Sequence, residues 1–520
     1  MNGRVTMEES MFSRALFSPK NHRHLNWVSK PLNTLVVVFC IILIGLTSAC
    51  GPTPEELSAF QTVTAMAAFT PTPQPSPTPA GITPDQDLTA ILASAADGDV
   101  ITLAPGIFNL TQGLNFDKSL TLIGVGDDQT TITASKPYQD VTTMLMFSGT
   151  GTLTFKGIKI EYTGSDSAAL IYMQSGTLWL EDCTLTGATL SASGKQIGAI
   201  SMANDAAAVI RGSHIAGSLN RLDPENPQKI PGGIFLAGTN KLTLESSSIT
   251  DSYIGVYAYG QSQVTITDSQ LTNNYSALTL LETATVSISG STLSNCTGSC
   301  IVTANDSQAS ISDNTFSDSP DSLAIQITAN SKAQINNNSL SSVKSAIIFM
   351  DNASGEAAGN TIEAFTSIGI VVQNESAPMI TNNIVFLGQE TFEDVIGISY
   401  QDSSSGEAVG NQFTNLYLGI SLDGAAAPLL ESNTIDFCRT GISYSGNAAG
   451  IANANIIQNG DSGILIDSPA SPTITNNTIQ AYFSAVMTDP EDWIEKLNFT
   501  GNNVTDGPPE ITIVTVTPLP

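Results

Sequence analysis

Three aspartates in the C-terminal half of the sequence could carry out chemistry: Asp402, Asp423 and Asp467. In the repeat described below, Asp423 and Asp467 lie two rungs apart on one face, ~9.6 Å by strand spacing, near the upper limit for an inverting carboxylate pair. Asp402 and Asp423 fall on neighbouring rungs and could bind Ca²⁺, which prefers oxygen ligands. Gln373 and Gln401 share this face as candidate substrate-binding groups. A solvated polar face is the competing interpretation, and it is favoured.

Three aromatic residues form a second candidate site. Phe235, Tyr257 and Tyr259 fall on adjacent rungs, beneath a loop over residues 217–231 that contains Arg221. Exposed aromatic rings beside polar groups are typical of surfaces that stack on sugar rings. The competing and favoured interpretation is that the loop simply covers these rings.

His214 is the only histidine after the leader, and it follows Arg211 closely. The repeat places Arg211 outward on a second strand and His214 outward on a third strand, with a sharp corner between them. Both side chains therefore point away from the face that carries the other candidates, and we assign them no function.

A repeat with a base period of 22 residues places all of these side chains. A small polar residue, usually Asn, returns just ahead of a buried aliphatic residue. The marked positions are Ile158, Cys183, Ser213, Ser247, Ser269, Ser291, Asn314, Asn338, Asn360, Asn383, Asn411, Asn433, Asn455, Asn477 and Asn503. Hydrophobicity alternates with period two within each copy, which indicates short strands rather than helices. Such a period predicts a solenoid with three strands and three corners per rung.

This repeat resembles the right-handed parallel β-helix of the pectin-lyase fold over roughly residues 99–504. The resemblance implies an all-β chain, a single right-handed parallel β-helix solenoid of about 16 rungs, with a groove over the first-strand sheet. Insertions border that sheet at Ala188–Ile197, Gly217–Pro231, Gly388–Val395 and Thr488–Lys496. The motifs of pectate lyases, polygalacturonases and pectinesterases are not visible. Because the fold hosts many activities, the resemblance predicts structure rather than function.

Two columns of side chains should point outward from the first-strand sheet. One column is Ser201, Phe235, Tyr257, Thr279, Val302, Gln326, Ile348, Val371, Ser399, Ser421, Ser443 and Leu465. The other is Ala203, Ala237, Tyr259, Leu281, Ala304, Thr328, Met350, Gln373, Gln401, Asp423, Ser445 and Asp467. Neither contains Lys, Arg or His. Polysaccharide lyases need a base and a cationic or metal partner for the uronate, so this observation argues against catalysis.

The marked Asn residues have a structural interpretation. Asn tolerates a left-handed backbone better than other non-glycine residues, so we expect it to form the sharpest corner. Stacked at ~4.8 Å, the amides would hydrogen-bond along the axis as a ladder of nine residues from Asn314 to Asn503.

The N-terminus resembles an export signal. The apolar run Leu35–Leu46 follows a basic leader and is too short to span a bilayer. It ends in "LTSAC", which resembles a bacterial lipobox and implies lipidation of Cys50. An uncleaved membrane anchor is the alternative. We expect residues 1–49 to be a signal peptide and 50–82 a lipid anchor and Pro/Thr-rich linker, followed by a β-helix domain at 83–505 and a tail at 506–520.

A short helix should cap the open N-terminal end of the solenoid. Thr83-Pro84-Asp85-Gln86 reads as a capping box with Pro at the first helical position, and the helix should end near Ala95.

Charge and cysteine content narrow the function further. Residues 1–49 hold five Lys or Arg and two Glu, so the remainder has 13 basic and 45 acidic residues and a net charge of −32. Such a field disfavours nucleic acid as a partner. Cys296 and Cys300 could bridge one corner, but buried free thiols are the favoured interpretation for them and for Cys183 and Cys438.

We therefore expect an exported, monomeric, membrane-anchored lipoprotein on the extracellular or periplasmic side. The leading interpretation is a glycan-binding or structural module for a polysaccharide or cell-surface glycan. The alternative is a carbohydrate-active enzyme, a lyase, hydrolase or epimerase that uses the three aspartates. A periplasmic accessory protein, as in the copper-related β-helix family, is a third, although no His/Met/Cys cluster supports metal delivery. No cofactor is evident, and Ca²⁺ is the only one the residues suggest.

Overall fold

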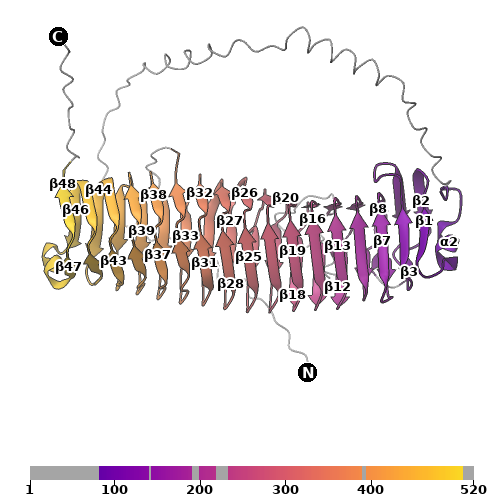
Figure 1. Cartoon of the computed structure of the whole chain (residues 1–520), viewed down its shortest axis with the longest axis horizontal. Helices are drawn as coiled ribbons and strands as arrows, with labels where there is room; N and C mark the ends of the chain where they lie inside the picture. The colour runs from indigo at the N-terminus through magenta and orange to yellow at the C-terminus, as the bar shows by residue number, and fades with distance from the viewer. Residues whose placement is uncertain (1–80, 140–141, 190–197, 218–231, 389–393, 508–520) are drawn as a thin grey trace, which may run out of the picture. The chain divides into compact units, whose positions relative to one another are not determined.

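The computed structural model describes residues 81–139, 142–189, 198–217, 232–388 and 394–507. These residues form one parallel β-helix, in which every rung stacks on the rung before it (Figure 1). The predicted all-β solenoid of about 16 rungs is confirmed, because the sheet that contains the second strand of each rung has 17 members.

The second strands form a sheet of their own. Its members are β1 (Asp99–Thr102), β4 (Leu120–Ile123), β7 (Thr152–Lys156), β10 (Thr177–Glu181), β13 (Ala207–Arg211), β16 (Lys241–Glu245), β19 (Gln263–Thr267), β22 (Thr285–Ser289), β25 (Gln308–Ser312), β28 (Lys332–Asn336), β31 (Ser354–Ala358), β34 (Met379–Thr381), β37 (Glu407–Val409), β40 (Leu429–Glu431), β43 (Ile451–Asn453), β45 (Thr473–Thr475) and β47 (Asn498–Thr500).

The third strands stack in the same way on the next side of the solenoid. They are β2 (Gly106–Leu110), β5 (Thr130–Ala134), β8 (Lys159–Tyr162), β11 (Thr184–Thr186), β14 (His214–Ala216), β17 (Ser248–Thr250), β20 (Gln270–Thr272), β23 (Thr292–Ser294), β26 (Thr315–Ser317), β29 (Ser339–Ser341), β32 (Thr361–Glu363), β35 (Ile384–Phe386), β38 (Gln412–Thr414), β41 (Thr434–Asp436) and β48 (Asn503–Asp506).

The first strands complete each rung. They are β3 (Leu114–Phe116), β6 (Thr143–Phe147), β9 (Ala169–Met173), β12 (Gly198–Asn204), β15 (Gly232–Gly238), β18 (Ile254–Gly260), β21 (Ser276–Leu280), β24 (Ile301–Thr303), β27 (Ser319–Ile327), β30 (Val343–Phe349), β33 (Ile368–Val372), β36 (Ile396–Tyr400), β39 (Leu418–Leu422) and β42 (Thr440–Tyr444). In the last rungs, β44 (Ile456–Asp467) and β46 (Thr478–Asp489) each combine a third and a first strand.

The register of the first strands agrees with the prediction. Strand pairing runs from Ser201 through Phe235 and Tyr257 and continues to Leu465, so the first predicted outward column is confirmed. The alternate residues, such as Ile464 and Ile466, are fully buried. Inward aliphatic side chains of all three strands thus form one continuous core along the axis.

Helix α2 (Leu88–Ser94) covers the N-terminal end of this core (Figure 1). Its buried face consists of Leu88 and Leu92, which join the hydrophobic cluster of the first rungs. The helix thereby shields apolar side chains that the open end of a solenoid would expose.

The start of α2 differs from the prediction. The helix begins after Asp87, whose side chain accepts a hydrogen bond from the Ala90 N–H at 3.1 Å. Thr83 N–H does donate to Gln86 Oε1 at 2.9 Å, but this bond closes a turn that precedes the helix, so Pro84 is not the first helical residue. The predicted end is confirmed, because Ala95 is the C-cap.

A side-chain ladder runs along the sharp corner between the second and third strands. The backbone N–H of each residue at this corner position donates to the side-chain oxygen of the equivalent residue one rung further on. The N···O distances are 2.8–3.2 Å. The accepting residues are Ser213, Ser247, Ser269, Ser291, Asn314, Asn338, Asn360, Asn383, Asn411, Asn433, Asn455, Asn477 and Asn502. The predicted Asn ladder is thus confirmed, and serines extend it toward the N-terminus.

Two details of that prediction were wrong. The left-handed residue is the one before each ladder position, such as Asn476 with a φ of 58°, because the ladder side chain itself must point inward. The last member is Asn502 rather than Asn503, because Thr478 pairs with Asn503 and places Asn477 beside Asn502.

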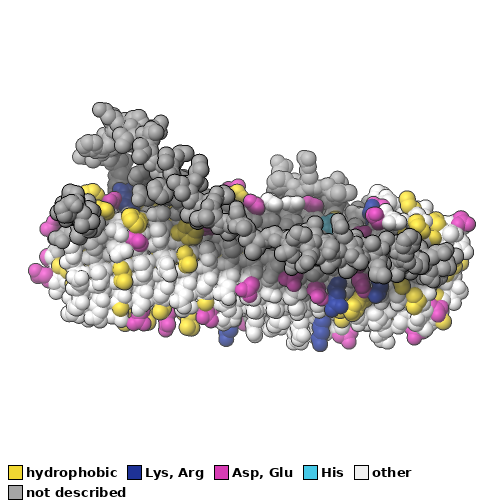
Figure 2. All heavy atoms as spheres, turned by 45° about the horizontal axis from the view of Figure 1, so that its top comes forward, with side chains coloured by type: hydrophobic (Ala, Val, Ile, Leu, Met, Phe, Trp, Pro, Cys, Tyr) yellow, Lys and Arg dark blue, Asp and Glu magenta, His cyan; other side chains and the backbone are white. Residues whose placement is uncertain are grey.

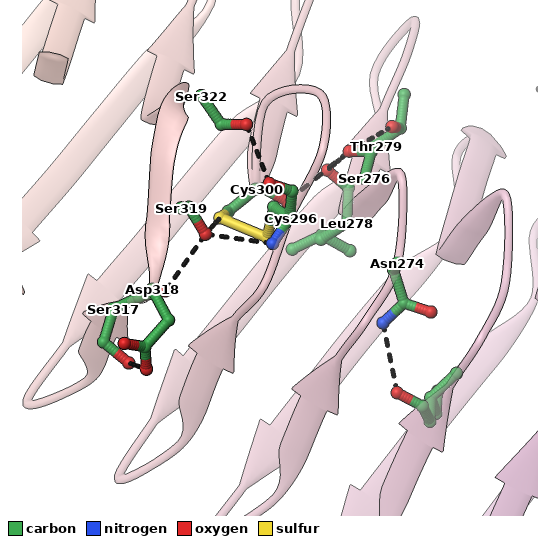
Figure 3. The surroundings of a disulfide bond; sticks show 11 residues. Asn274, Ser276, Leu278, Thr279, Cys296, Cys300, Ser317, Asp318, Ser319 and Ser322 are labelled. Atoms are coloured by element: carbon green, nitrogen blue, oxygen red, sulfur yellow. Dashed lines mark hydrogen bonds between the residues drawn. A yellow bond between two sulfur atoms is a disulfide. The ribbon is translucent and has the colours of Figure 1, made fainter. Parts of the chain in front are cut away.

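The cysteines correct another expectation. Cys296 and Cys300 form a disulfide across one corner, with 5.4 Å between their Cα atoms, whereas free thiols were favoured (Figure 3). Ser319 Oγ accepts from the Cys296 N–H at 2.9 Å, and Ser322 Oγ donates to the Cys296 carbonyl at 2.7 Å. Cys183 and Cys438 are buried free thiols, as predicted.

Replacement of one ladder residue by alanine should destabilise the solenoid strongly. Asn411 Oδ1 accepts from both the N–H and the Nδ2 of Asn383, each at 2.9 Å. In Asn411→Ala these two buried donors lose their acceptor, which we expect to lower the free energy of unfolding by about 3 kcal/mol. Urea titration followed by circular dichroism measures this, with the exposed Asn447→Ala as control. An equal effect of the two variants would contradict the role of the ladder.

Candidate functional site

Two of the three predicted aromatic residues, Phe235 and Tyr257, lie side by side on the first-strand face. Phe235 of β15 and Tyr257 of β18 are paired on adjacent strands, and their rings stack with centroids 5.1 Å apart and planes 13° apart. Tyr259 follows in the second outward column and is 41% exposed. A hydrogen bond to the Glu282 carboxylate raises the pKa of Tyr259, while burial raises the pKa of Tyr257.

Two further tyrosines stack on the same rung as Tyr257 and on the next rung, and sequence reasoning missed them. Tyr253 and Tyr275 stack with centroids 5.0 Å apart and planes 22° apart, at the corner just before β18 and β21. Tyr253 lies three residues before the inward Val256, and Tyr275 three residues before the inward Leu278. The two predicted outward columns contain only residues within the strands, so they do not include this corner position. We call Phe235, Tyr253, Tyr257, Tyr259 and Tyr275 the aromatic patch. Arg221 and the loop around it lie outside the described residues.

Asp402 is held in a structural role. It has a left-handed backbone with a φ of 58°, and its carboxylate accepts from the N–H and the Nδ2 of Asn374 at 3.1 and 3.3 Å. The same kind of bond recurs on three other rungs, where a side-chain oxygen accepts from a backbone N–H of the preceding rung. The accepting residues are Asn374, Asp351 and Asn305. Asp402 therefore ends a second, shorter ladder at the corner after the first strand.

The structure does not assemble the remaining acidic candidates into one site. Asp423 accepts a hydrogen bond from Ser445 Oγ at 2.9 Å, and Gln401 Nε2 donates to Ser399 Oγ at 3.0 Å. Gln373 lies in the same outward column as Gln401. Within the described ranges, no group of three or more His, Cys, Asp or Glu residues could hold a metal ion.

Asp467 belongs to a groove that the sequence did not reveal. It pairs with Asp489 across β44 and β46, beside the 3-10 helix η3 (Glu491–Lys496). An open groove of about 670 Å³ lies there, lined among others by Leu465, Asp467, Met487, Asp489, Glu491 and Ile494. Burial raises the pKa of Asp467, and the charge of Asp489 raises it further. The η3 segment is the predicted insertion near residues 488–496, whereas most of the other three insertions lies outside the described residues.

Arg211 and His214 lie where the register predicted, away from the first-strand face. Arg211 pairs with Glu245 at 2.8 Å and lies over the Trp179 ring, 5.1 Å from its centroid. His214 Nδ1 lies 2.6 Å from Ser248 Oγ on the next third strand. These contacts are structural.

Comparisons with known proteins agree with this fold. A family described as right handed beta helix region matches residues 143–287 and 389–515, which together are more than half of the chain. This chain belongs to that family. The family described as periplasmic copper-binding protein (NosD) matches residues 221–396, about a third of the chain. No curated protein matches the sequence.

Several solved structures are weakly similar. The Dettilon tailspike protein is 14% identical, with 73% of this chain and 59% of that chain covered and a TM-score of 0.32. A single-site mutant of the periplasmic alginate epimerase AlgG is 12% identical, with 74% and 85% covered and a TM-score of 0.32. The Agl-KA catalytic domain is 15% identical, with 84% and 70% covered and a TM-score of 0.33. These likenesses are too low to support a functional argument.

The segment that matches the copper-binding family does not fit a copper site. Residues 221–396 contain no histidine. Both cysteines of that segment are joined in the disulfide and cannot act as thiolate ligands.

Neither helix in the described part of the chain is long and apolar enough to cross a membrane.

The raised pKa of Asp467 predicts a pH-dependent stability change. Because the folded protein binds this proton more tightly than the unfolded chain, the free energy of unfolding falls as pH rises from the ordinary carboxyl pKa of about 3.9 through the raised value. Asp467→Asn should therefore raise the melting temperature at pH 7, and the gain should vanish below about pH 3.9. Differential scanning fluorimetry across this range measures it. A gain that is largest in acid would contradict the assignment.

Proposed function

We propose that this protein is an exported, lipid-anchored module that binds a glycan through the aromatic patch on its first-strand face. The observation that carries the proposal is the patch itself: five aromatic side chains on three successive rungs, four of them in two stacked pairs. Aromatic rings beside polar groups suit the apolar faces and hydroxyl rims of sugars.

Charge supports the same class of ligand. The two outward columns of the first-strand face carry no Lys, Arg or His, whereas the second column contains Asp423 and Asp467, and Glu282 follows Leu281 of the same column. Figure 2 shows another side of the molecule, on which Asp and Glu side chains are spread along the length of the solenoid. A neutral glycan avoids the repulsion that a polyanion would meet on such an acidic protein.

Two features support the proposal that the protein is exported: the N-terminal leader and the disulfide. The apolar run ahead of Cys50 and the "LTSAC" segment support cleavage and lipidation, with the Pro-rich spacer at residues 70–79 extending from the membrane. The Cys296–Cys300 disulfide supports an oxidising compartment.

A carbohydrate-active enzyme is the second candidate, and the Asp467 groove is the observation that favours it. A carboxyl group with a raised pKa beside a second carboxylate is an arrangement used for general acid catalysis. Asp402 is engaged in its ladder, so the acid and base of such an enzyme would be Asp467 and Asp489.

A glycan array tests the binding proposal. Tyr257→Ala and Phe235→Ala should each weaken the binding of any retained glycan about tenfold, because each removes one stacked ring worth about 1.5 kcal/mol. Thr279→Ala, in the same outward column one rung beyond Tyr257, is the matched control and should bind as the unmodified chain does. Unchanged binding in both aromatic variants would contradict the proposal.

Product analysis on the same glycans separates the two candidates. Glycan cleavage or epimerisation that is lost in Asp467→Asn while binding persists would show an enzyme. If the glycan binds but no product forms, either with or without Ca²⁺, the result would support the binding module over the enzyme.

A further inference from the structure

A second cluster of exposed and half-buried side chains lies at the corner that precedes the first strands of the C-terminal rungs. Tyr417, Arg439, Asp461 and Phe483 occupy the same corner position as Tyr253 and Tyr275, three residues before the first inward aliphatic residue. Successive rungs are joined there by the Thr440 N–H to Tyr417 carbonyl bond at 3.0 Å and the Ser462 N–H to Arg439 carbonyl bond at 2.9 Å.

Along the axis, the two ionic side chains lie between the two aromatic ones. The Arg439 guanidinium lies over the Tyr417 ring, 5.2 Å from its centroid. Arg439 Nε is 3.6 Å from Asp461 Oδ2, and both side chains are about half exposed. Phe483 is 78% exposed, the highest value among the large hydrophobic side chains of the described residues.

Phe437 adds an unusual backbone to this corner. It has a φ of 52° and is 46% exposed, whereas Asn415 and Asn459 hold the equivalent corner on the neighbouring rungs with φ of 58° and 60°. A left-handed backbone costs a bulky side chain roughly 1–2 kcal/mol, and Asn tolerates it well. Because nearly half of the Phe437 side chain stays exposed to water, the free energy gained by burying the rest offsets only part of the cost of its left-handed backbone. Folding alone does not account for Phe437.

We propose that Tyr417, Phe437, Arg439, Asp461 and Phe483, the corner site, bind a second stretch of the same glycan chain that contacts the aromatic patch. The proposal rests on the proposed function. The phenyl rings would lie against sugar ring faces, while the Arg439 donors and the Asp461 acceptors reach hydroxyl groups between them.

The separation of the two surfaces defines the ligand. Tyr275 and Tyr417 occupy the same corner position six rungs apart, ~29 Å at the strand spacing. A ligand that contacts both must therefore be a polymer. The acidic character of the chain favours a neutral polysaccharide over a polyuronate. Simultaneous contact at two sites raises the overall affinity without any new contact, by a factor that can exceed one hundred.

The experiment compares long and short ligands on the complete chain. The probes are dextran, galactomannan and xyloglucan as neutral polymers, polygalacturonate as an anionic polymer, and the tetrasaccharide of each. The test variant combines Phe437→Asn with Phe483→Ser. We expect its affinity for the retained neutral polymer to fall about tenfold or more, and its affinity for the matching tetrasaccharide to fall no more than about twofold.

Stability gives an independent readout. Phe437→Asn should raise the melting temperature while weakening polymer binding. Ala364→Asn is the matched control, because Ala364 occupies the same corner after β32 with a φ of 50° and lies outside the corner site. This control should also raise the melting temperature and leave polymer binding unchanged.

The outcomes separate this inference from the proposed function. If Tyr257→Ala weakens polymer binding and the double variant does not, the corner site is wrong while the glycan module stands. A lower melting temperature in Phe437→Asn would show a structural role for the ring and also overturn the inference. Tight polygalacturonate binding would overturn the neutral ligand. If no probe binds the unmodified chain, both proposals fail.

Discussion

Thirteen successive rungs of the solenoid, from Cys183 to Asn477, each depend on one buried backbone N–H. At the sharp corner, a left-handed residue turns the chain, and the following N–H finds no strand partner. A buried N–H without an acceptor costs about 1–3 kcal/mol. The side-chain oxygen of Ser or Asn on the next rung removes this cost, and the Asn amide also donates to the carbonyl of the preceding rung, as Asn411 Nδ2 does to Ile380 at 2.8 Å. Each rung is thereby fixed in register to the next.

That register decides what the surface presents. Once Asn383 and Asn411 are aligned, the alternation along each first strand determines which residues enter the core and which face water. This is why Phe235 and Tyr257 meet as a stacked pair although 22 residues separate them in sequence. The same alignment brings Tyr417, Arg439 and Asp461 into one row at the corner. Both proposed binding surfaces are consequences of the ladder.

The sequence predicted the ladder and the register of the first strands because the ladder residues recur at a regular spacing. It did not predict which residue takes the left-handed backbone, although glycines such as Gly359 and Gly410 just before ladder positions are a signal for it. It placed the last ladder member at Asn503 instead of Asn502, because both residues fit the pattern. Asp467 was placed on the correct face, but its groove depends on η3, whose path follows from packing. The tyrosine pair Tyr253–Tyr275 was missed because corner positions lie outside the alternation of the strands.

Amide hydrogen exchange at the corner tests the ladder most directly. With residue-resolved mass spectrometry, the N–H groups of Asn383, Asn411 and Asn433 should exchange as slowly as those of the buried strand residue Ile420, although these three lie at corners rather than in strands. This result would show that side chains of the next rung protect them. Exchange at the rate of an exposed loop amide would contradict the account, because the register and both proposed surfaces derive from these bonds.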